Sequence, residues 1–230
     1  MNAEEIESAI QRARASLVSG SGLEGTSFWK AVRRIRADRV LAQRFAAEVG
    51  EIDTQAFSSA VRLKVPAGFG VAVLSGGTAA GIVLLVAAER MQGLLADLSF
   101  LAGFGGLLLS THSLAHWVVG RAMGMRFTHF FLGGPPPPRP GAKVDYTTYL
   151  LVAPRKRALF HASGAVVTKI LPFALIPFAV IAGVSRWVAF ALAAIGVLQV
   201  VTDALFSIKS SDWKKYIREM KASNAAKGWD

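Results

Sequence analysis

Four apolar segments constrain the fold of this chain more than any other feature. A helix of about twenty apolar residues spans the hydrocarbon core of a bilayer, and each segment approaches that length. The chain of 230 residues is 53% hydrophobic, which is too apolar for an ordinary soluble domain of this size. We therefore predict a mainly α-helical, multi-pass membrane protein whose four transmembrane helices comprise residues 67–88, 98–119, 161–183 and 184–206.

The basic residues gather in three segments outside these spans. Of the 26 Lys and Arg residues, ten lie in 1–64, seven in 120–160 and six in 207–230. The cytoplasmic loops of membrane proteins carry such an excess of Lys and Arg. We therefore predict a cell-membrane protein with both termini and the 120–160 loop in the cytoplasm. This placement explains the net charge of +11 without a nucleic-acid partner.

The same pattern divides the chain into three expected parts. Residues 1–63 form a cytoplasmic helical region, 64–206 form the four-span membrane domain, and 207–230 form a basic cytoplasmic tail. We expect no signal peptide, because the charged first sixty residues or so lack an apolar core segment.

Within residues 1–63, the spacing of apolar residues predicts two helices. Ile6 and Ile10 follow helical spacing in the first, and the second is expected to start with a cap at Thr26 and to run to Gly50. The apolar face of the second helix, which includes Val32, lies near several arginines. The helix either packs in a hairpin with solvated charges or rests on an anionic membrane surface.

The connection between the second and third spans has β-strand character. Residues 127–132 and 147–152 are β-prone, and the run Gly-Gly-Pro-Pro-Pro-Pro-Arg-Pro at 133–140 separates them. Four consecutive prolines favour an extended polyproline II conformation. We expect a small β-containing cytoplasmic connection with two short strands and a semi-rigid connector.

Two histidines four residues apart, His112 and His116, lie near the end of the second apolar segment. On a helix such a pair shares one face, so both imidazoles can bind one metal ion. Histidine inside a bilayer is costly and indicates a functional site. The zinc-protease motif H-E-x-x-H has a glutamate directly after the first histidine as the general base, whereas this chain has Ser113.

The fourth span contains one acidic residue, Asp203. Counted from the outer ends of the spans with the helical rise of 1.5 Å per residue, His112, His116 and Asp203 lie about 21, 27 and 29 Å deep. Two imidazoles and one carboxylate with an open fourth position make a catalytic-type zinc site. The sequence therefore predicts that these three side chains bind zinc.

In the order of these motifs, the sequence resembles the site-2 protease family of membrane-embedded zinc metallopeptidases. The resemblance covers residues 98–206: the histidine pair, the β-prone run after it, the segment Ser-Gly-Ala-Val-Val-Thr at 163–168, and Asp203. It implies a helix with two histidine ligands, a β-rich connection on the cytoplasmic side, and a later helix with the aspartate ligand.

The departures from the family pattern concern the chemistry. Ser113 replaces the catalytic glutamate, Ala165 and Thr168 stand at the Pro and Asn positions of the family's Gly-Pro-x-x-Asn motif, and Ala204 follows the aspartate where glycine is usual. A hydroxyl cannot act as the general base at neutral pH without a partner. We therefore expect a pseudo-protease in the lipid bilayer that binds a transmembrane protein client without cutting it, either alone or as an oligomer.

Two alternatives concern the charged residues. An active zinc protease would need a substitute general base, and His129 and His161 are the candidates. In a protein without metal, Lys169, which lies well inside the third span, would pair with Asp203 and neutralise it.

A third alternative is an intramembrane serine protease. The segment His-Ala-Ser-Gly at 161–164 faintly resembles the Ser-Gly element of rhomboid proteases, with Ser163 as the nucleophile and His112 or His116 as the base. Rhomboid proteases have at least six spans, whereas this chain has four apolar segments.

Overall fold

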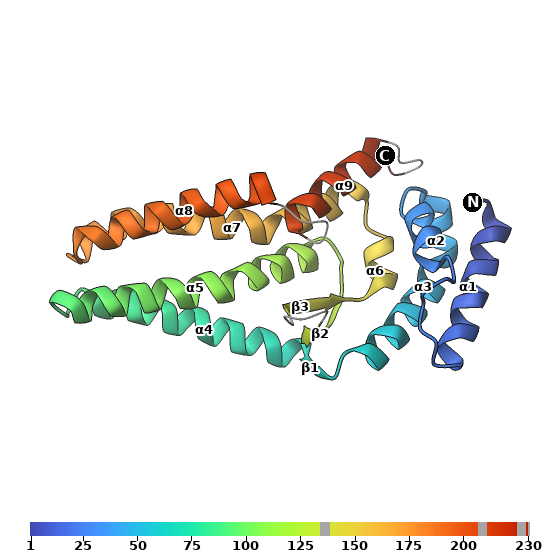
Figure 1. Ribbon diagram of the computed structural model, residues 1–230, viewed down its shortest axis with the longest axis horizontal. Coiled ribbons are helices and arrows are strands. Elements are labelled where there is room, and N and C mark those ends of the chain that lie inside the picture. Colours follow the sequence, from blue (N-terminus) through green and yellow to red (C-terminus); the bar gives the residue numbers. More distant parts are fainter. Residues whose placement is uncertain (134–138, 207–210, 225–228, 230) are drawn as a thin grey trace. The chain divides into compact units, whose positions relative to one another are not determined.

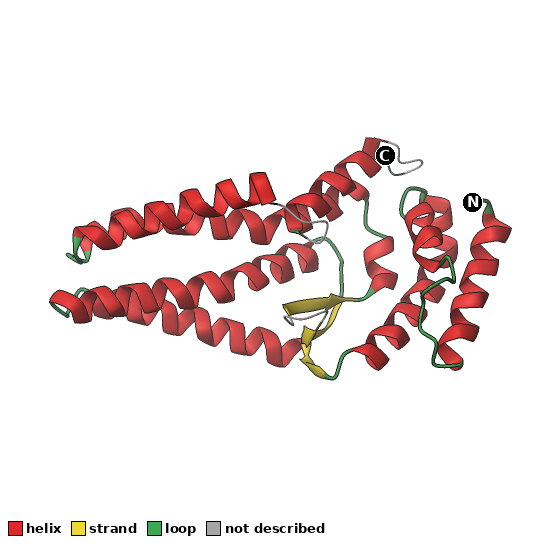
Figure 2. Ribbon diagram, viewed as in Figure 1, coloured by secondary structure: helices red, strands yellow, loops and turns green. Residues whose placement is uncertain are grey.

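The computed structural model describes residues 1–133, 139–206, 211–224 and 229 (Figures 1 and 2). The described chain is mainly helical and contains one small sheet. Its contacts group it into two compact units. The first unit comprises Met1–Ala67, Gly120–Ala158 and Ile217–Asp230, and the second comprises Gly68–Val119 and Leu159–Tyr216.

Three helices in the first unit share one apolar core. The buried side chains include Ile6 of the first helix, Val32 of the second and Phe45 of the third. Because the apolar face of the second helix is buried in this unit, the hairpin interpretation is favoured over the membrane-surface one. The helices are α1 (Ala3–Val18), α2 (Phe28–Ile35) and α3 (Arg39–Ala60).

The predicted single helix from Thr26 to Gly50 is wrong, because the chain breaks near Asp38. The Asp38 carboxylate accepts hydrogen bonds from the backbone N–H groups of Val40 and Leu41 at 3.1 and 3.3 Å. These bonds satisfy N–H groups that have no partner within a helix, so a new helix, α3, starts there. It passes Gly50 and ends ten residues later.

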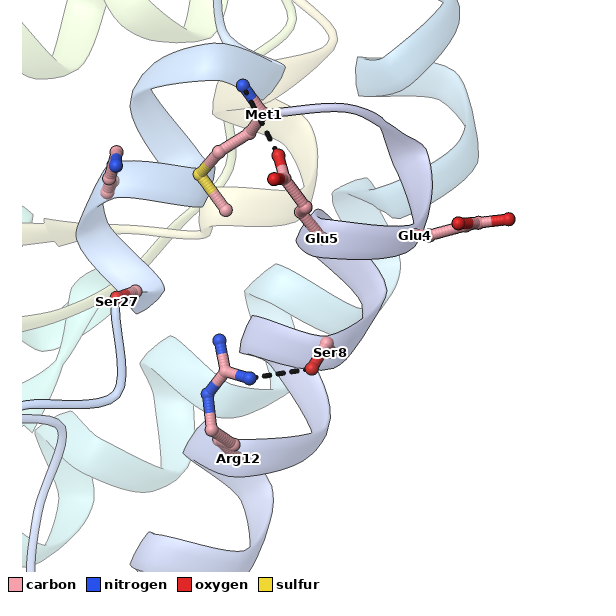
Figure 3. Close-up of a pocket in the computed structure, with 7 residues that line it drawn as sticks. Met1, Glu4, Glu5, Ser8, Arg12 and Ser27 are labelled. Carbon is pink, nitrogen blue, oxygen red and sulfur yellow. Dashed lines mark hydrogen bonds and ion pairs between the residues drawn. The ribbon is translucent and has the colours of Figure 1, made fainter.

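A polar hollow of about 510 Å³ lies beside the start of α1 (Figure 3). Arg12 donates to Ser8 Oγ at 2.6 Å, and the Met1 ammonium lies 3.5 Å from a carboxylate oxygen of Glu5. Because these groups pair locally and face solvent, the hollow is a solvated part of the surface.

The sheet consists of three antiparallel strands in the order β1–β2–β3. The predicted strand at 127–132 is confirmed as β2. The other two were not predicted: one begins three residues after the end of α3, and the other begins near the end of the proline-rich run. The strands are β1 (Leu63–Pro66), β2 (Phe127–Gly133) and β3 (Arg139–Val144).

The predicted strand at 147–152 is wrong, because this segment contains the short helix α6 (Tyr146–Leu150). Asp145 caps the helix by accepting a hydrogen bond from Thr147 N at 2.9 Å. The cap outweighs the β-propensity of the neighbouring threonines. Part of the expected polyproline connector, 134–138, lies outside the described residues.

A cluster of charges is buried in the first unit around Glu219. Its carboxylate oxygen Oε1 accepts from Arg36 and, at 2.9 Å, from Tyr149 Oη, while Oε2 accepts from Arg157 Nε at 3.0 Å. The other two nitrogens of Arg157 donate to the carbonyl oxygens of Val152 and Arg36, both at 2.8 Å. Glu219 and Arg157 are fully buried, so these bonds replace the water that both charges have lost.

Within the described residues, four helices are long and apolar enough to cross a membrane, as predicted. Two of them start earlier than predicted. The third begins at Pro154, since a proline in the first turn of a helix loses no hydrogen bond. The four are α4 (Ala67–Ala88), α5 (Gly93–Ala122), α7 (Pro154–Ile181) and α8 (Arg186–Phe206).

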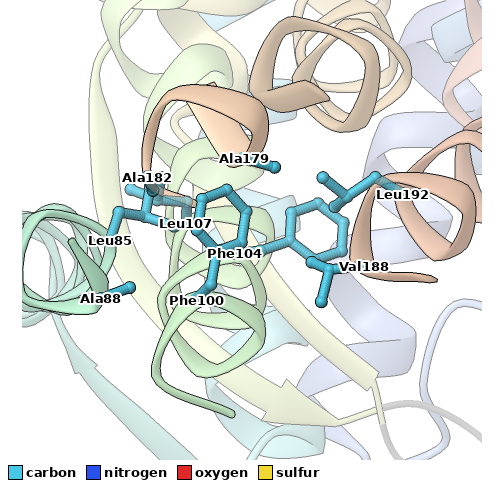
Figure 4. Packing of buried hydrophobic residues seen from close by; sticks show 9 residues of the cluster. All are labelled: Leu85, Ala88, Phe100, Phe104, Leu107, Ala179, Ala182, Val188 and Leu192. Carbon is cyan, nitrogen blue, oxygen red and sulfur yellow. The ribbon is translucent and has the colours of Figure 1, made fainter. Parts of the chain in front are cut away.

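Apolar side chains from these four helices meet in the core of the second unit (Figure 4). Phe100 of α5 is fully buried there with Ala179 of α7 and Leu192 of α8. Between α4 and α5 the backbones approach closely, since a Cβ on Gly103 would lie 2.7 Å from Gly81 O. The helix that carries the two histidines is thus held by close packing.

Asp97, near the start of α5, forms hydrogen bonds with the start of α8. Its carboxylate accepts from Ser185 N at 2.8 Å and from Trp187 Nε1 at 2.9 Å, where α8 begins. The last described helix is α9 (Asp212–Asn224), whose residues up to Tyr216 belong to the second unit.

Candidate metal centre

The two predicted histidines project from one face of α5. Their ring centroids lie 4.9 Å apart, and the rings are nearly perpendicular. Gly164 of α7 makes room for both: a Cβ at this position would lie 2.9 Å from His112 Cε1 and closer still to His116. The glycine of the 163–168 segment therefore forms a cradle for the two imidazoles that a larger residue would fill.

The carboxylate beside the histidines belongs to Asp212, the first residue of α9. Its Oδ2 lies 3.1 Å from His116 Nε2 and 3.3 Å from His112 Nε2, and Lys215 Nζ lies 3.1 Å from its Oδ1. The donor atoms of the three residues all lie within 4.8 Å of one another. Within the described part of the chain, they are the group of His, Asp and Glu side chains that could hold a metal ion.

Asp203 is not part of this group of possible ligands, although it lines the same cavity as His112 and Asp212. Its carboxylate pairs with the Lys169 ammonium, which also donates to Ala165 O at 3.4 Å. The structure therefore brings the two predicted histidines together with a different carboxylate and gives Asp203 the lysine partner that the ion-pair alternative expected.

The remaining candidate residues do not belong to this group of ligands. Ser113 is half-buried on α5. His129 lies on β2 in the first unit, where its ring centroid is 6.0 Å from that of Phe57. His161 lies on α7 with its ring centroid 4.8 Å from that of Phe160.

The hydrogen bonds of His116 fix where its protons lie. His116 Nδ1 is 2.8 Å from Phe160 O, and since a carbonyl oxygen can only accept, Nδ1 carries the hydrogen. In the neutral imidazole Nε2 then has a lone pair, which faces the carboxylate of Asp212. Two acceptor atoms this close need a positive charge between them, either a second imidazole proton or a metal ion.

The arrangement fits a metal ion. Ligand bonds of about 2.0–2.2 Å in a tetrahedral zinc site hold neighbouring donor atoms about 3.3–3.6 Å apart, close to the two distances from Asp212. The bond from His116 Nδ1 to a backbone carbonyl is of the kind that orients metal-binding histidines.

The carboxyl group of Asp212 is suited to bind a cation. Burial on its own would raise its pKa, but hydrogen bonds from His112 and His116, which their Nε2 atoms donate when they carry a proton, outweigh burial and hold the pKa of Asp212 well below its usual range. The group is therefore ionised at neutral pH, as a metal ligand must be.

Sequence reasoning missed Asp212 because the residue follows the fourth span. One signal could have found it. The run Ser-Ser-Asp at 210–212 precedes a stretch with helical spacing, and such residues are typical of a helix start. A helix there would place one carboxylate in its first turn, close in the chain to the end of the last span.

No protein-family model matches the chain, and neither a curated protein nor a solved structure matches it. The assignment of this centre therefore rests on its own residues.

Proposed function

We propose that this chain is an integral membrane protein whose His112, His116 and Asp212 together hold one divalent transition-metal ion, with zinc as the expected ion. The observation that carries the proposal is the approach of His116 Nε2 to the Asp212 carboxylate while the other ring nitrogen donates to a carbonyl. Two imidazoles, one carboxylate and an open position form the ligand set of catalytic zinc sites. When bound, such an ion polarises a carbonyl or activates a water molecule.

We further propose that the centre serves to bind a membrane client and that it does not cut peptide bonds. The general base of the zinc-protease motif is missing, because Ser113 stands in its place. Loss of general acid–base catalysis alone costs a factor of about 10²–10⁴ in rate.

The resemblance to site-2 proteases is part of this proposal. The order of a two-histidine helix, a small sheet and two later helices is the order that the family implies. The third ligand departs from it, since Asp212 of α9 takes the place expected for Asp203 of α8.

One observation favours an active zinc protease as a second candidate. The carboxylate of Asp203 lines the same cavity as His112 and Asp212, so it could replace the missing base once Lys169 releases it. Zinc-dependent cleavage of a membrane substrate by the wild-type protein, abolished by Asp203→Asn with the metal retained, would establish this function in place of the first.

The serine-protease alternative is weaker, although Ser163 Oγ lies 3.2 Å from His116 Nδ1. The hydroxyl donates to Phe160 O at 2.8 Å, a bond within its own helix. The backbone N–H groups around Ser163 are inside α7, where they serve the helix and cannot form an oxyanion hole.

We also propose the cell membrane as the location, with both termini cytoplasmic and the apolar helices in contact with lipid. The clusters of Lys and Arg support this orientation. Because the chain has no cysteine, single cysteines at Ser58, Ala142 and Ser223 can be labelled cleanly. Labelling of any of them from outside intact cells would contradict the orientation.

The metal content of the purified protein tests the centre directly. We expect about one zinc ion per chain in the wild type, and almost none in His116→Ala and Asp212→Ala, because each loses a ligand. The matched control is Asp203→Asn combined with Lys169→Met, which removes the neighbouring ion pair and should keep the zinc. Full zinc retention by Asp212→Ala, or its loss from the control, would contradict the proposed ligand set.

A further inference from the structure

Both acidic side chains of α9 point into the protein. Asp212 contacts the two histidines of α5, and Glu219 is fully buried with its arginine partners. Residues seven positions apart lie on nearly the same face of a helix, so these two carboxylates define the inward face of α9. The 13 residues of α9 include no other acidic residue, so the outward face has no negative charge of its own.

Three basic residues share this outward face of α9. Lys214, Arg218 and Lys221 follow one another at intervals of four and three residues, the spacing of neighbours on one helix face, and all three are exposed. In the part of the chain that the structure describes, the ion pairs of α9 are those of Asp212 and Glu219. We call the three exposed cations the basic face of α9.

The start of α9 lies close to the ends of two apolar helices of the second unit. Asp212 follows the last residue of α8 by six positions and lies 3.1 Å from His116, which is six positions before the end of α5. The next residue, Trp213, is 40% exposed, and its ring stacks on that of Tyr216 with centroids 5.1 Å apart. Such aromatic side chains are enriched where a membrane helix meets water.

We infer that the basic face of α9 binds the anionic phospholipid headgroups of the membrane that the four apolar helices cross. The inference rests on the membrane location proposed above. The cytoplasmic leaflet of a cell membrane has a negative surface potential, and clusters of Lys and Arg directly after a membrane helix bind its lipids. The general excess of cytoplasmic positive charge explains how many cations this segment has. It does not explain why both carboxylates of α9 lie on the other face.

Other partners fit these observations less well. An acidic polypeptide or a nucleic acid would also be attracted to three positive charges. Neither accounts for the exposed Trp213 next to them at the end of the apolar helices. A layer of headgroups accommodates both features, because an indole ring lies at headgroup level and the long stems of Lys and Arg let their charges reach the phosphates.

A fluorescent label on α9 tests this inference in the whole protein. The chain has no cysteine, so Asn224→Cys gives a single labelling position, which is exposed. The protein is placed in phosphatidylcholine nanodiscs that contain a lipid with a nitroxide quencher on its headgroup, and part of the phosphatidylcholine is replaced by phosphatidylserine. We expect quenching to rise with the phosphatidylserine content. It should fall again at about 1 M salt, where the Debye length is about 3 Å.

Removal of the basic face should abolish this rise. Each cation near an anionic surface contributes about 1 kcal/mol, so each loss weakens the attraction about fivefold. The variant Lys214→Gln, Arg218→Gln, Lys221→Gln loses all three contributions. Replacement of the two lysines by arginine keeps the charges and should keep the rise, which separates the effect of charge from a change in the helix.

The matched control removes three exposed cations from α1 and α2, by Arg12→Gln, Lys30→Gln and Arg33→Gln. It has the same net charge as the variant without the basic face and should keep the rise. An equal loss in this control, or an unchanged rise without the basic face, would overturn the inference. Complete reversal of the quenching by soluble polyglutamate at the same concentration of charge would also overturn it, in favour of an acidic polypeptide.

The same experiment separates this inference from the proposed function. If the wild type does not enter nanodiscs, the membrane location is wrong and the inference with it. If it enters them and phosphatidylserine has no effect on the quenching, only the inference is wrong. The result does not depend on the orientation in the cell, since both leaflets of the nanodisc contain phosphatidylserine. Labelling of Ser223→Cys from outside intact cells would therefore contradict the orientation alone.

Discussion

The two units bury charged groups in opposite ways. In the first, the carboxylate of Glu219 receives hydrogen bonds from Arg36, Tyr149 and Arg157, so both of its oxygens have donors. In the second, the carboxylate of Asp212 faces the nitrogens of two imidazoles, and one of these nitrogens has no hydrogen in the neutral ring. The first arrangement supplies donors to both oxygens of its carboxylate and serves stability, whereas the second needs a positive charge between its carboxylate and the imidazole nitrogen and is suited to binding.

Loss of the Glu219 charge should have the largest effect, because this carboxylate is the counter-charge of two buried guanidinium groups. Glu219→Gln leaves two guanidinium groups in the core without a counter-charge, which should lower the free energy of unfolding by about 3–5 kcal/mol. Denaturant unfolding in detergent, followed by tryptophan fluorescence, measures this change. Glu51→Gln is the control, since its pair with Arg14 is exposed and should contribute less than about 0.5 kcal/mol. Equal stability of the two variants would remove the contrast between the units.

A methyl group added at Gly164, the cradle of the two histidines, should have the next largest effect, which is on the affinity for the metal ion. Gly164→Ala places a Cβ against both imidazoles and should weaken metal binding about 10–100-fold, as other disturbances of ligand orientation do. Competition with a chelator gives the affinity. The control is Gly105→Ala on α5, where an added Cβ would meet no atom within 4 Å. If both variants bind the metal as the wild type does, the cradle has no role in the centre.

The smallest expected effect is the response of the first unit to alkaline pH. Burial, with a smaller contribution from Tyr149, raises the pKa of Tyr146 to about 12. The folded state therefore favours the neutral phenol: its contribution is complete below about pH 10 and is lost as the pH rises through 12. We expect a loss of roughly 1–2 kcal/mol over this range. In Tyr146→Phe, part of this loss should disappear, whereas Tyr216→Phe is the control; identical alkaline profiles for all three proteins would show that Tyr146 does not titrate as a buried group.

The sequence alone predicted those features that depend on local pattern. Four apolar segments of sufficient length become helices whatever their neighbours, and the first of them has the predicted bounds, Ala67–Ala88. The pairing of His112 with His116 follows from helical spacing alone. Local pattern also has competing readings: the threonines near residue 147 favour a strand, but a single hydrogen bond to Asp145 starts a helix instead.

The third member of the ligand group could not be predicted in this way. In the sequence analysis, the third ligand was chosen by its depth in the membrane, and Asp203 is the carboxylate whose depth matches that of the two histidines. Depth does not specify the direction of a side chain, and the carboxylate of Asp203 forms an ion pair with Lys169 of α7. Asp212 follows the last span and contacts His116, which lies 96 residues earlier in the sequence. No short sequence window contains such a long-range contact.

The origin of the ligands in the chain sets an order of events during synthesis. His116 leaves the ribosome 96 residues before Asp212. At typical elongation rates of 5–20 residues per second, the two histidines wait roughly 5–20 s for their carboxylate. During that time the nascent chain offers only two of the three ligands of the proposed centre, so a metal ion would be bound late, after all four apolar helices have been made.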